Sequence, residues 1–336
     1  MEELKVSIII PAFNVSQYIE KCLKSIQEQT YRNIQIIIVD DMSTDDTVPV
    51  ITVMQKQDNR IHLIQLQKNS GSAVARQKGI EESTGEIILF VDADDWYCDN
   101  NTLKKIVEVY QNTKADCIMF SYRTVHKYGI VIPKRFKGKA GGYSVQQVAE
   151  MKACNPLPHW HYLWNKCFKG EILRSGVIRF HAELRRAQDV RFNSDFLRVA
   201  RKFYIMGSAY FYEYNCANMN QITRRKVESS INTEIEQFEH LKEEFNRLCE
   251  DYNAINASNK AMEGLYTNFL QGVYRLLSRN ASKKWFAELE RRIRRDKTFY
   301  EVSVCMGDKS GHIEKRVRRN VIFNRFKQHI KNKLKM

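Results

Sequence analysis

The sequence lacks several features that would assign it quickly to a class of protein. None of the eight cysteines belongs to a Cys-x-x-Cys pair, which argues against a structural zinc site or a dithiol redox site and favours free thiols in a reducing compartment. No run approaches the roughly 18 to 20 apolar residues that span a bilayer. The acidic start at Glu2 and Glu3 is unlike a signal peptide. We therefore expect a protein that is soluble or peripherally attached to a membrane.

Acidic residues are scarce in the second part of the chain, although the first part has an excess of them. The first 100 residues contain 9 Lys and Arg against 16 Asp and Glu, a net charge of −7, whereas all 336 residues together carry +15. The rest of the chain is therefore strongly basic. An acidic part that suits a metal-dependent site precedes a basic part that could face phosphates, an anionic membrane or an anionic acceptor.

Short apolar runs alternate with helical periodicity between residues 5 and 122, a pattern typical of a mostly parallel sheet covered by helices. We expect strands near 5–10, 34–39, 61–66, 86–91 and 116–121, and helices near 18–26, 45–56, 72–84 and 101–111. Gly85 is interpreted as the stop of the third helix. Residues 123–145, rich in glycine and basic residues, are expected to form a loop or hairpin.

Two regions follow from this pattern. We interpret residues 1–225 as an α/β domain with a Rossmann-like sheet, in which 1–122 and 123–225 form two halves, and residues 226–336 as a helical, basic C-terminal region. The last segment, 315–336, contains nine Lys and Arg and no acidic residue, with apolar side chains every four residues. This segment is either an interfacial membrane helix on an anionic bilayer or an ordinary basic helix packed on its own domain.

Carboxylates follow two of the expected strands at the point where each strand ends. Asp40 and Asp41 follow the apolar run 36–39, and Asp92, Asp94 and Asp95 follow the run 87–91. Ligands bind beyond the carboxyl ends of the strands in open α/β sheets, so these acids are expected to share one cleft. Converging carboxylates repel one another unless a cation lies between them, and oxygen ligands suit Mg²⁺ or Mn²⁺. A metal-bound phosphate ligand is the natural inference.

Four segments in order, 6–14, 38–45, 71–79 and 85–95, resemble the motifs of family 2 glycosyltransferases, and a looser match extends over 164–168 and 188–189. The resemblance implies the nucleotide-diphospho-sugar transferase fold and a donor that is a nucleotide sugar, with UDP favoured over GDP or deoxythymidine diphosphate. We expect a cytoplasmic enzyme. The basic tail would attach such an enzyme to the inner face of the cell membrane.

The resemblance assigns roles to individual residues of the first 100. Asp41 accepts the imide N–H of uracil, Asp92 lies on the ribose side and Asp94 holds the Mn²⁺ or Mg²⁺ that bridges the two phosphates. The expected donor-binding residues are Pro11, Phe13, Asn14, Asp41, Arg76, Asp92 and Ala93. Phe13 has an alternative interpretation as a core aromatic, and the three aspartates near 94 could simply cap a helix or solvate a loop.

Transfer to a hydroxyl also needs a base, because an alcohol is a poor nucleophile until its proton is removed. The resemblance places that base at Asp189, where the family often has a Glu-Asp pair. Here Gln188 replaces the glutamate, which removes one negative charge beside Asp189. Trp160, Trp164 and Gln188 are candidate acceptor contacts, and core packing is an equal alternative for Trp164. A zinc site at His159 and His161 is disfavoured because no cysteine completes the spacing.

The resemblance therefore implies an inverting, metal-dependent glycosyltransferase that moves a sugar to a hydroxyl of a glycan or glycolipid, in lipopolysaccharide or capsule synthesis. A nucleotidyltransferase is the first alternative, but it would need a phosphate loop rich in glycine and lysine where this chain has residues 11–14. A nucleic-acid-binding protein, prompted by the pI of about 9.4, is the second. It leaves the acidic first part unexplained, so no nucleic-acid partner is expected.

Overall fold

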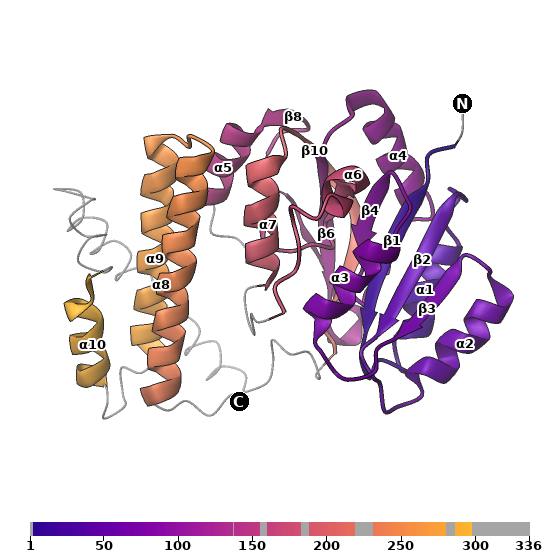
Figure 1. Cartoon of the computed structure of the whole chain (residues 1–336), viewed down its shortest axis with the longest axis horizontal. Coiled ribbons are helices and arrows are strands. Elements are labelled where there is room, and N and C mark those ends of the chain that lie inside the picture. Colours follow the sequence, from indigo (N-terminus) through magenta and orange to yellow (C-terminus); the bar gives the residue numbers. More distant parts are fainter. Residues whose placement is uncertain are drawn as a thin grey trace. The chain divides into compact units, whose positions relative to one another are not determined.

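The computed structural model describes residues 3–136, 138–154, 160–182, 188–218, 231–279 and 286–297. The chain divides into two compact units (Figure 1). Unit 1 comprises Met1–Val145 and Leu157–Arg224, and unit 2 comprises Gln146–Pro156 and Arg225–Met336. The predicted tail helix over 315–336 and His159 lie outside the described residues.

The first half of unit 1 alternates strands and helices, as the sequence predicts. Its elements are β1 (Val6–Ala12), α1 (Ile19–Gln27), β2 (Ile34–Asp40), α2 (Thr47–Gln57), β3 (Ile61–Gln65), α3 (Ser72–Glu82) and β4 (Ile87–Phe90). The strand order here is β3-β2-β1-β4, and all three pairs are parallel. The parallel pairing sets the carboxyl ends of these strands along one edge of the sheet.

The side chains of β1 point alternately to the two faces of the sheet and pack against a helix on each face. Ile8 and Ile10 lie in the fully buried cluster that also contains Leu23 of α1. Ile9 points the other way, where it meets Gly79 of α3 so closely that a Cβ on Gly79 would lie 2.3 Å from an Ile9 methyl carbon. The helix α3, which carries Arg76, therefore packs directly on β1. This contact fixes the position of Arg76 relative to the sheet.

The second half of unit 1 is mixed rather than parallel. Its elements are β5 (Trp96–Tyr97), α4 (Thr102–Thr113), β6 (Cys117–Val125), the 3₁₀ turn η1 (Lys127–Gly129), β7 (Val131–Lys134), β8 (Gly141–Ser144), β9 (Lys166–Lys169), α6 (Gly170–Arg174), α7 (Gln188–Val199) and β10 (Lys202–Asn215). β9 lies antiparallel between β4 and β6, and β6 pairs with β10 in parallel. β7 forms the predicted hairpin with β6.

The interpretation of Gly85 as a helix stop is wrong. α3 ends at Glu82, three residues earlier, and its C-cap Ser83 is already extended. A Cβ at Gly85 would lie 2.5 Å from the backbone nitrogen of Ser7 and 2.8 Å from the backbone oxygen of Lys5. A side chain at Gly85 would therefore clash with the backbone of Lys5 and Ser7, because the chain entering β4 runs beside the start of β1. This is a long-range cause that helix-capping rules do not include.

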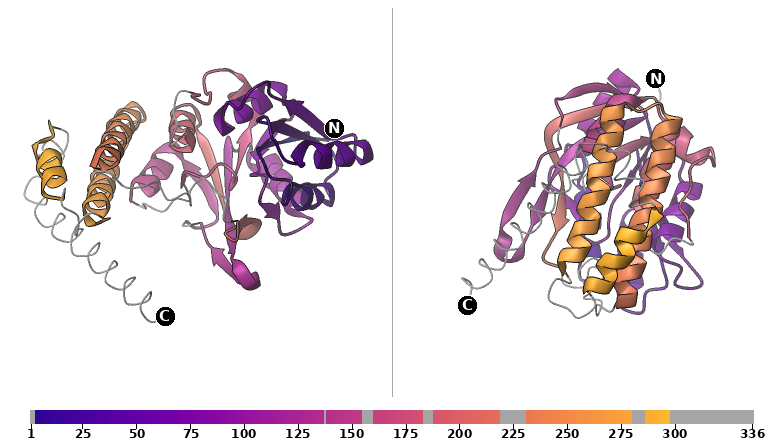
Figure 2. Two further views of the ribbon diagram at one scale, coloured as in Figure 1. Left: turned by 90° about the horizontal axis from the view of Figure 1, so that it is seen from below. Right: turned by 90° about the vertical axis from the view of Figure 1, so that its left-hand side faces the viewer.

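Unit 2 is helical, as the sequence predicts for the C-terminal region. It contains most of α5 (Val145–Cys154), together with α8 (Ile231–Ala254), α9 (Asn259–Arg279) and α10 (Phe286–Arg295). The helices α8 and α9 lie side by side (Figure 2) and share a buried interior that includes Phe245 and Phe269. Asn268 of α9 donates a 2.7 Å hydrogen bond to the backbone oxygen of Ala153, which ties α5 to this bundle. Among the described helices, none is long and apolar enough to cross a membrane.

Candidate active site

The ends of β1, β2 and β4 bring three loops together at one edge of the sheet. Ala12 is the register partner of Asp40, and the backbone N–H of Asp41 donates to the carbonyl of Ala12 over 2.8 Å. The N–H of Val91 donates in turn to the carbonyl of Ile9 over 3.0 Å. The loops that follow β1, β2 and β4 carry the predicted site residues, and these loops are therefore neighbours at one edge of the sheet.

The first loop holds Pro11, Phe13 and Asn14. Pro11 is the last but one residue of β1 and is half-buried. Phe13 is 43% exposed, so its ring does not belong to the core. Asn14 adopts a left-handed backbone conformation with φ of 51°, which asparagine tolerates well. Its side-chain oxygen accepts a 2.8 Å hydrogen bond from the N–H of Thr44, which fastens the first loop to the second.

Asp41 is buried and bound to the start of α3. Its two carboxylate oxygens accept hydrogen bonds from the N–H groups of Ser70 and Gly71 over 2.6 and 2.7 Å. Free backbone N–H groups at a helix start carry partial positive charge and suit a carboxylate. Each carboxylate oxygen can accept a further hydrogen bond, so Asp41 retains acceptor capacity for a ligand N–H.

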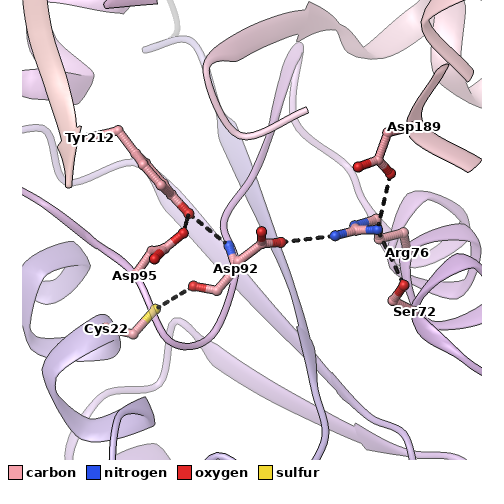
Figure 3. A network of polar contacts seen from close by, with 7 residues as sticks. All are labelled: Cys22, Ser72, Arg76, Asp92, Asp95, Asp189 and Tyr212. Atoms are coloured by element: carbon pink, nitrogen blue, oxygen red, sulfur yellow. Dashed lines mark hydrogen bonds and ion pairs between the residues drawn. The ribbon is translucent and has the colours of Figure 1, made fainter. Parts of the chain in front are cut away.

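Arg76 joins two aspartates that are far apart in the sequence (Figure 3). Its Nη2 donates to Asp92 Oδ1 over 2.8 Å, and its Nη1 forms an ion pair of 3.4 Å with Asp189 Oδ1. Arg76 is only 8% exposed, and its Nη1 also lies 3.4 Å from Ser72 Oγ. One buried positive charge therefore lies between the residue predicted on the ribose side and the residue predicted as the base.

Asp189 lies in the first turn of α7, and its side chain is 38% exposed. Enclosure of the carboxyl group raises its pKa above the ordinary value; the positive charge of Arg76 opposes this rise and the negative charge of Asp92 adds to it. Asn193, one turn later, donates to the backbone oxygens of Asp189 and His161, which fixes the start of the helix. The result is a carboxyl group with a raised pKa that is still partly exposed to solvent.

The loop after β4 is supported from beneath by β10. Asp95 is fully buried and accepts hydrogen bonds from the Tyr212 hydroxyl at 2.9 Å and the Asn215 N–H at 2.7 Å. The Tyr212 hydroxyl also accepts from the N–H of Asp92. Burial, followed by the charges of Asp94 and Asp92, raises the pKa of Asp95 well above its ordinary value. Residues 92–95, which we call the Asp-x-Asp loop, are therefore held in place by hydrogen bonds to β10 as well as by the local turn of their own backbone.

Asp94 and Ala93 occupy the outer part of this loop. Ala93 is buried, and Asp94 Oδ2 accepts a 2.7 Å hydrogen bond from the side chain of Asn218. Within the described part of the chain there is no group of three or more His, Cys, Asp or Glu side chains arranged to hold a metal ion. A cation bound at Asp94 would take its other oxygen ligands from the substrate of the protein. Mg²⁺ commonly binds nucleotides in this way.

The candidate acceptor residues lie mainly in packed aromatic clusters. Trp160 and Trp164 are each 4% exposed. Trp164 stacks on Tyr212 with centroids 4.6 Å apart and on Tyr162 with centroids 4.5 Å apart, so both of its faces are occupied. The structure therefore gives Trp164 the core role that was the alternative, and Trp160 offers almost no surface to a sugar. Gln188 is half-buried at the start of α7, beside Asp189.

Sequence reasoning missed Tyr212, Asn215 and Asn218, which hold the aspartate loop from 117 to 124 residues further along the chain. It also missed Lys166, a buried residue whose positive charge lowers the pKa of Asp189. Of these four residues, only Lys166 lies within a segment that resembles the family, the loose match at 164–168. No local pattern marks an aromatic side chain in a strand as the support of a loop on another strand.

Comparisons with known proteins agree with this arrangement. The profile described as "Glycosyl transferase family 2" matches residues 7–205. The glycosyltransferase EpsJ of Bacillus subtilis is 25% identical over 262 residues, which are 77% of this chain and 73% of EpsJ. The poly(ribitol-phosphate) β-N-acetylglucosaminyltransferase TarS of Staphylococcus aureus is 27% identical over 215 residues, which are 62% of this chain but only 35% of TarS.

The crystal structure of residues 1–349 of S. aureus TarS has the same fold, with a TM-score of 0.67 at 20% identity over 95% of this chain and 90% of that one. The same fragment in complex with UDP-GlcNAc matches with a TM-score of 0.65 at 19% identity, over the same shares of the two chains. The family profile covers more than half of the sequence and ends within β10, so it includes both the strand-end aspartates and Asp189. The chain belongs to glycosyl transferase family 2.

Proposed function

We propose that this glycosyltransferase moves a sugar from a UDP-sugar to a hydroxyl of a bacterial surface glycan or glycolipid, with inversion at the anomeric carbon. The observation that carries the proposal is the contact of Arg76 with both Asp92 and Asp189, because it brings a donor-side carboxylate and a basic carboxylate to one guanidinium. Among the alternatives from the sequence, the family assignment argues against a nucleotidyltransferase.

The donor proposal is supported by Asp41, Phe13 and Arg76. Asp41 retains acceptor capacity for the imide N–H of uracil, and the exposed ring of Phe13 offers a surface for the base. The buried Nε of Arg76 has no hydrogen-bond acceptor among the described residues, which leaves a donor for an anionic ligand. UDP is favoured because the matched TarS fragment has been solved with UDP-GlcNAc.

The proposed chemistry requires a proton acceptor and a stabilised leaving group. Asp189 accepts the proton of the acceptor hydroxyl, whose oxygen attacks the anomeric carbon as the bond to the diphosphate breaks. Arg76 lies beside the base, where its charge keeps Asp189 ionised and oriented. Asp94, whose Oδ2 accepts a hydrogen bond from Asn218, would hold Mn²⁺ or Mg²⁺. That cation would neutralise charge on the departing diphosphate.

Lipopolysaccharide or capsule is the proposed product class. The relationship to TarS, which is named as a poly(ribitol-phosphate) β-N-acetylglucosaminyltransferase, supports a bacterial polymer as the acceptor in general. The membrane attachment of segment 315–336 is a separate proposal. Deleting that segment is expected to weaken sedimentation with anionic vesicles, whereas unchanged sedimentation would contradict it.

The test is release of nucleoside diphosphate from a panel of UDP-, GDP- and deoxythymidine-diphosphate sugars with Mn²⁺. We expect turnover of a UDP-sugar, reduced about 100-fold or more by Asp94→Asn through loss of charge neutralisation at the diphosphate. Glu108→Gln, an exposed carboxylate on α4, is the matched control and should behave as wild type. Turnover without added metal, or an Asp94→Asn variant as active as wild type, would remove the metal from the proposal.

A further inference from the structure

The hairpin formed by β6 and β7 exposes a cluster of large apolar side chains. Tyr128 at its tip is 98% exposed, and Ile130, Val131 and Ile132 are 56%, 45% and 40% exposed. Elsewhere in the described chain the exposed large apolar side chains are Phe13, Met42, Val53 and Val177. Both views in Figure 2 show the magenta hairpin projecting from the sheet. Such a concentration on a projecting element marks an interaction surface.

The apolar side chains lie on both faces of this hairpin. Val131 and Ile132 pair with Val125 and Thr124, and neighbouring residues of a strand point to opposite faces. β7 pairs with β6 alone, so it is an edge strand of the described sheet. A protein docked against one face would leave the other face exposed, whereas the interfacial layer of a bilayer surrounds an inserted tip from every side.

The charge of the region matches an anionic surface. No acidic residue occurs between Asp116 and Glu150. The same stretch contains six basic residues: Arg123, Lys127, Lys134, Arg135, Lys137 and Lys139. Lys127 lies in the turn next to the apolar tip, and Arg135 follows directly on β7. Basic residues beside exposed aromatic and aliphatic side chains are the combination that binds anionic lipid headgroups and the adjoining acyl boundary.

The hairpin is poorly suited to strand pairing with a second copy of the chain. Pro133 lies within β7 and has no N–H to donate, and Lys134 follows it. Proline and lysine on an edge strand are devices that block edge-to-edge pairing. We propose that the β6–β7 hairpin is a membrane-contact element that inserts Tyr128 and Ile130 into the interface of an anionic bilayer. This contact needs no donor sugar, so it stands or falls independently of the proposed reaction.

The position of the hairpin can be measured in the full chain with Tyr128→Trp and vesicles of phosphatidylglycerol that carry brominated acyl chains. We expect the fluorescence added by this tryptophan, relative to wild type, to be quenched by the bromolipid. Val177→Trp, at an exposed site elsewhere in unit 1, should be unaffected. An unquenched tryptophan at position 128 would overturn the proposal, even if segment 315–336 binds the vesicles.

The second measurement is sedimentation with phosphatidylglycerol or phosphatidylcholine vesicles. Tyr128→Ser combined with Ile130→Ser should weaken binding to the anionic vesicles about tenfold or more, and each basic residue replaced near the tip should weaken it about fivefold. Val177→Ser is the control. Equal binding by the double variant, no binding by wild type, or a wild-type dimer that the double variant converts to a monomer would each overturn the proposal.

Discussion

At the scale of single residues, Arg76 decides the electrostatics of the site. Its guanidinium is almost fully buried and contacts Asp92 and Asp189, whose negative charges raise the pKa of Arg76 against the effect of burial. Without this cation, the repulsion between the negative charges of Asp92 and Asp189 would be less compensated. The pKa of Asp189 is therefore set by four influences: burial and the charge of Asp92 raise it, and the charges of Arg76 and Lys166 lower it.

This balance predicts how transfer depends on pH. Asp189 must be ionised to act as a base, so activity should fall as the pH drops through its raised pKa. Arg76→Gln removes the charge that lowers this pKa, so the acid limb of the kcat profile should move to higher pH. In Arg76→Lys, which keeps the positive charge, the acid limb should return most of the way to its wild-type position. An acid limb that does not move in Arg76→Gln would contradict the assignment of Asp189 as the base.

Asp189→Asn tests the base directly. The amide cannot accept the proton, so transfer should fall about 100-fold to 10,000-fold, the range of general base catalysis. Binding of UDP, measured by calorimetry, should change little, because the predicted donor contacts lie on other residues. Full transfer activity in this variant would remove Asp189 as the base.

The hydroxyl of Tyr212 should contribute to the stability of the protein and to the position of the Asp-x-Asp loop. Tyr212→Phe removes the hydroxyl that donates to Asp95 and accepts from the Asp92 N–H, while the packed ring remains. Leaving buried polar groups unsatisfied should cost about 1–3 kcal/mol of unfolding free energy. Tyr128→Phe, at a fully exposed tyrosine, should cost nothing measurable in the same denaturant titration.

At the scale of elements, close backbone contacts align the strands that deliver the carboxylates. Gly85 precedes β4, and the site a Cβ would occupy there is filled by backbone atoms of Lys5 and Ser7. Backbone atoms cannot rotate away as a side chain can. The position of the Asp-x-Asp loop relative to β1 therefore depends on this glycine.

Gly85→Ala should destabilise the protein by about 2 kcal/mol or more, because overpacking must displace β1 or β4. Gly142→Ala is the matched control, since a Cβ there would meet only the Phe203 carbonyl oxygen at 4.0 Å. Chemical denaturation of both variants measures the difference. Equal midpoints for Gly85→Ala and wild type would show that the strands adapt without cost.

At the scale of the whole molecule, the two units are not consecutive in the sequence. Residues 146–156 leave unit 1 and group with the helices that follow residue 225. Val148, Ala149 and Ala153 of this segment are buried, and Gln146 donates to the carbonyl of Ile255 in the same unit. A boundary drawn at residue 225 therefore separates α5 from its partners.

This grouping predicts the behaviour of truncated chains. A chain ending at residue 224 keeps α5 but lacks α8 to α10, so it should expose an apolar helix face and aggregate or unfold at a lower temperature. A chain ending at residue 297 keeps those helices and should match the full protein. Thermal unfolding and light scattering compare them, and equal behaviour of the two truncations would contradict the grouping.

The sequence alone determined the strand and helix alternation of the first 120 residues, the carboxylates at the strand ends and the family, because each depends on residues close together in the chain. Apolar runs specify buried strands locally, and an acid after such a run lies at the edge of the sheet wherever the strand is placed. The tertiary structure alone decided which acids share a cation. Arg76 meets Asp189 across 113 residues, Tyr212 supports Asp95 across 117, and Trp164 stacks in the core instead of facing an acceptor. These outcomes depend on packing between distant segments, whose free energy no local pattern contains.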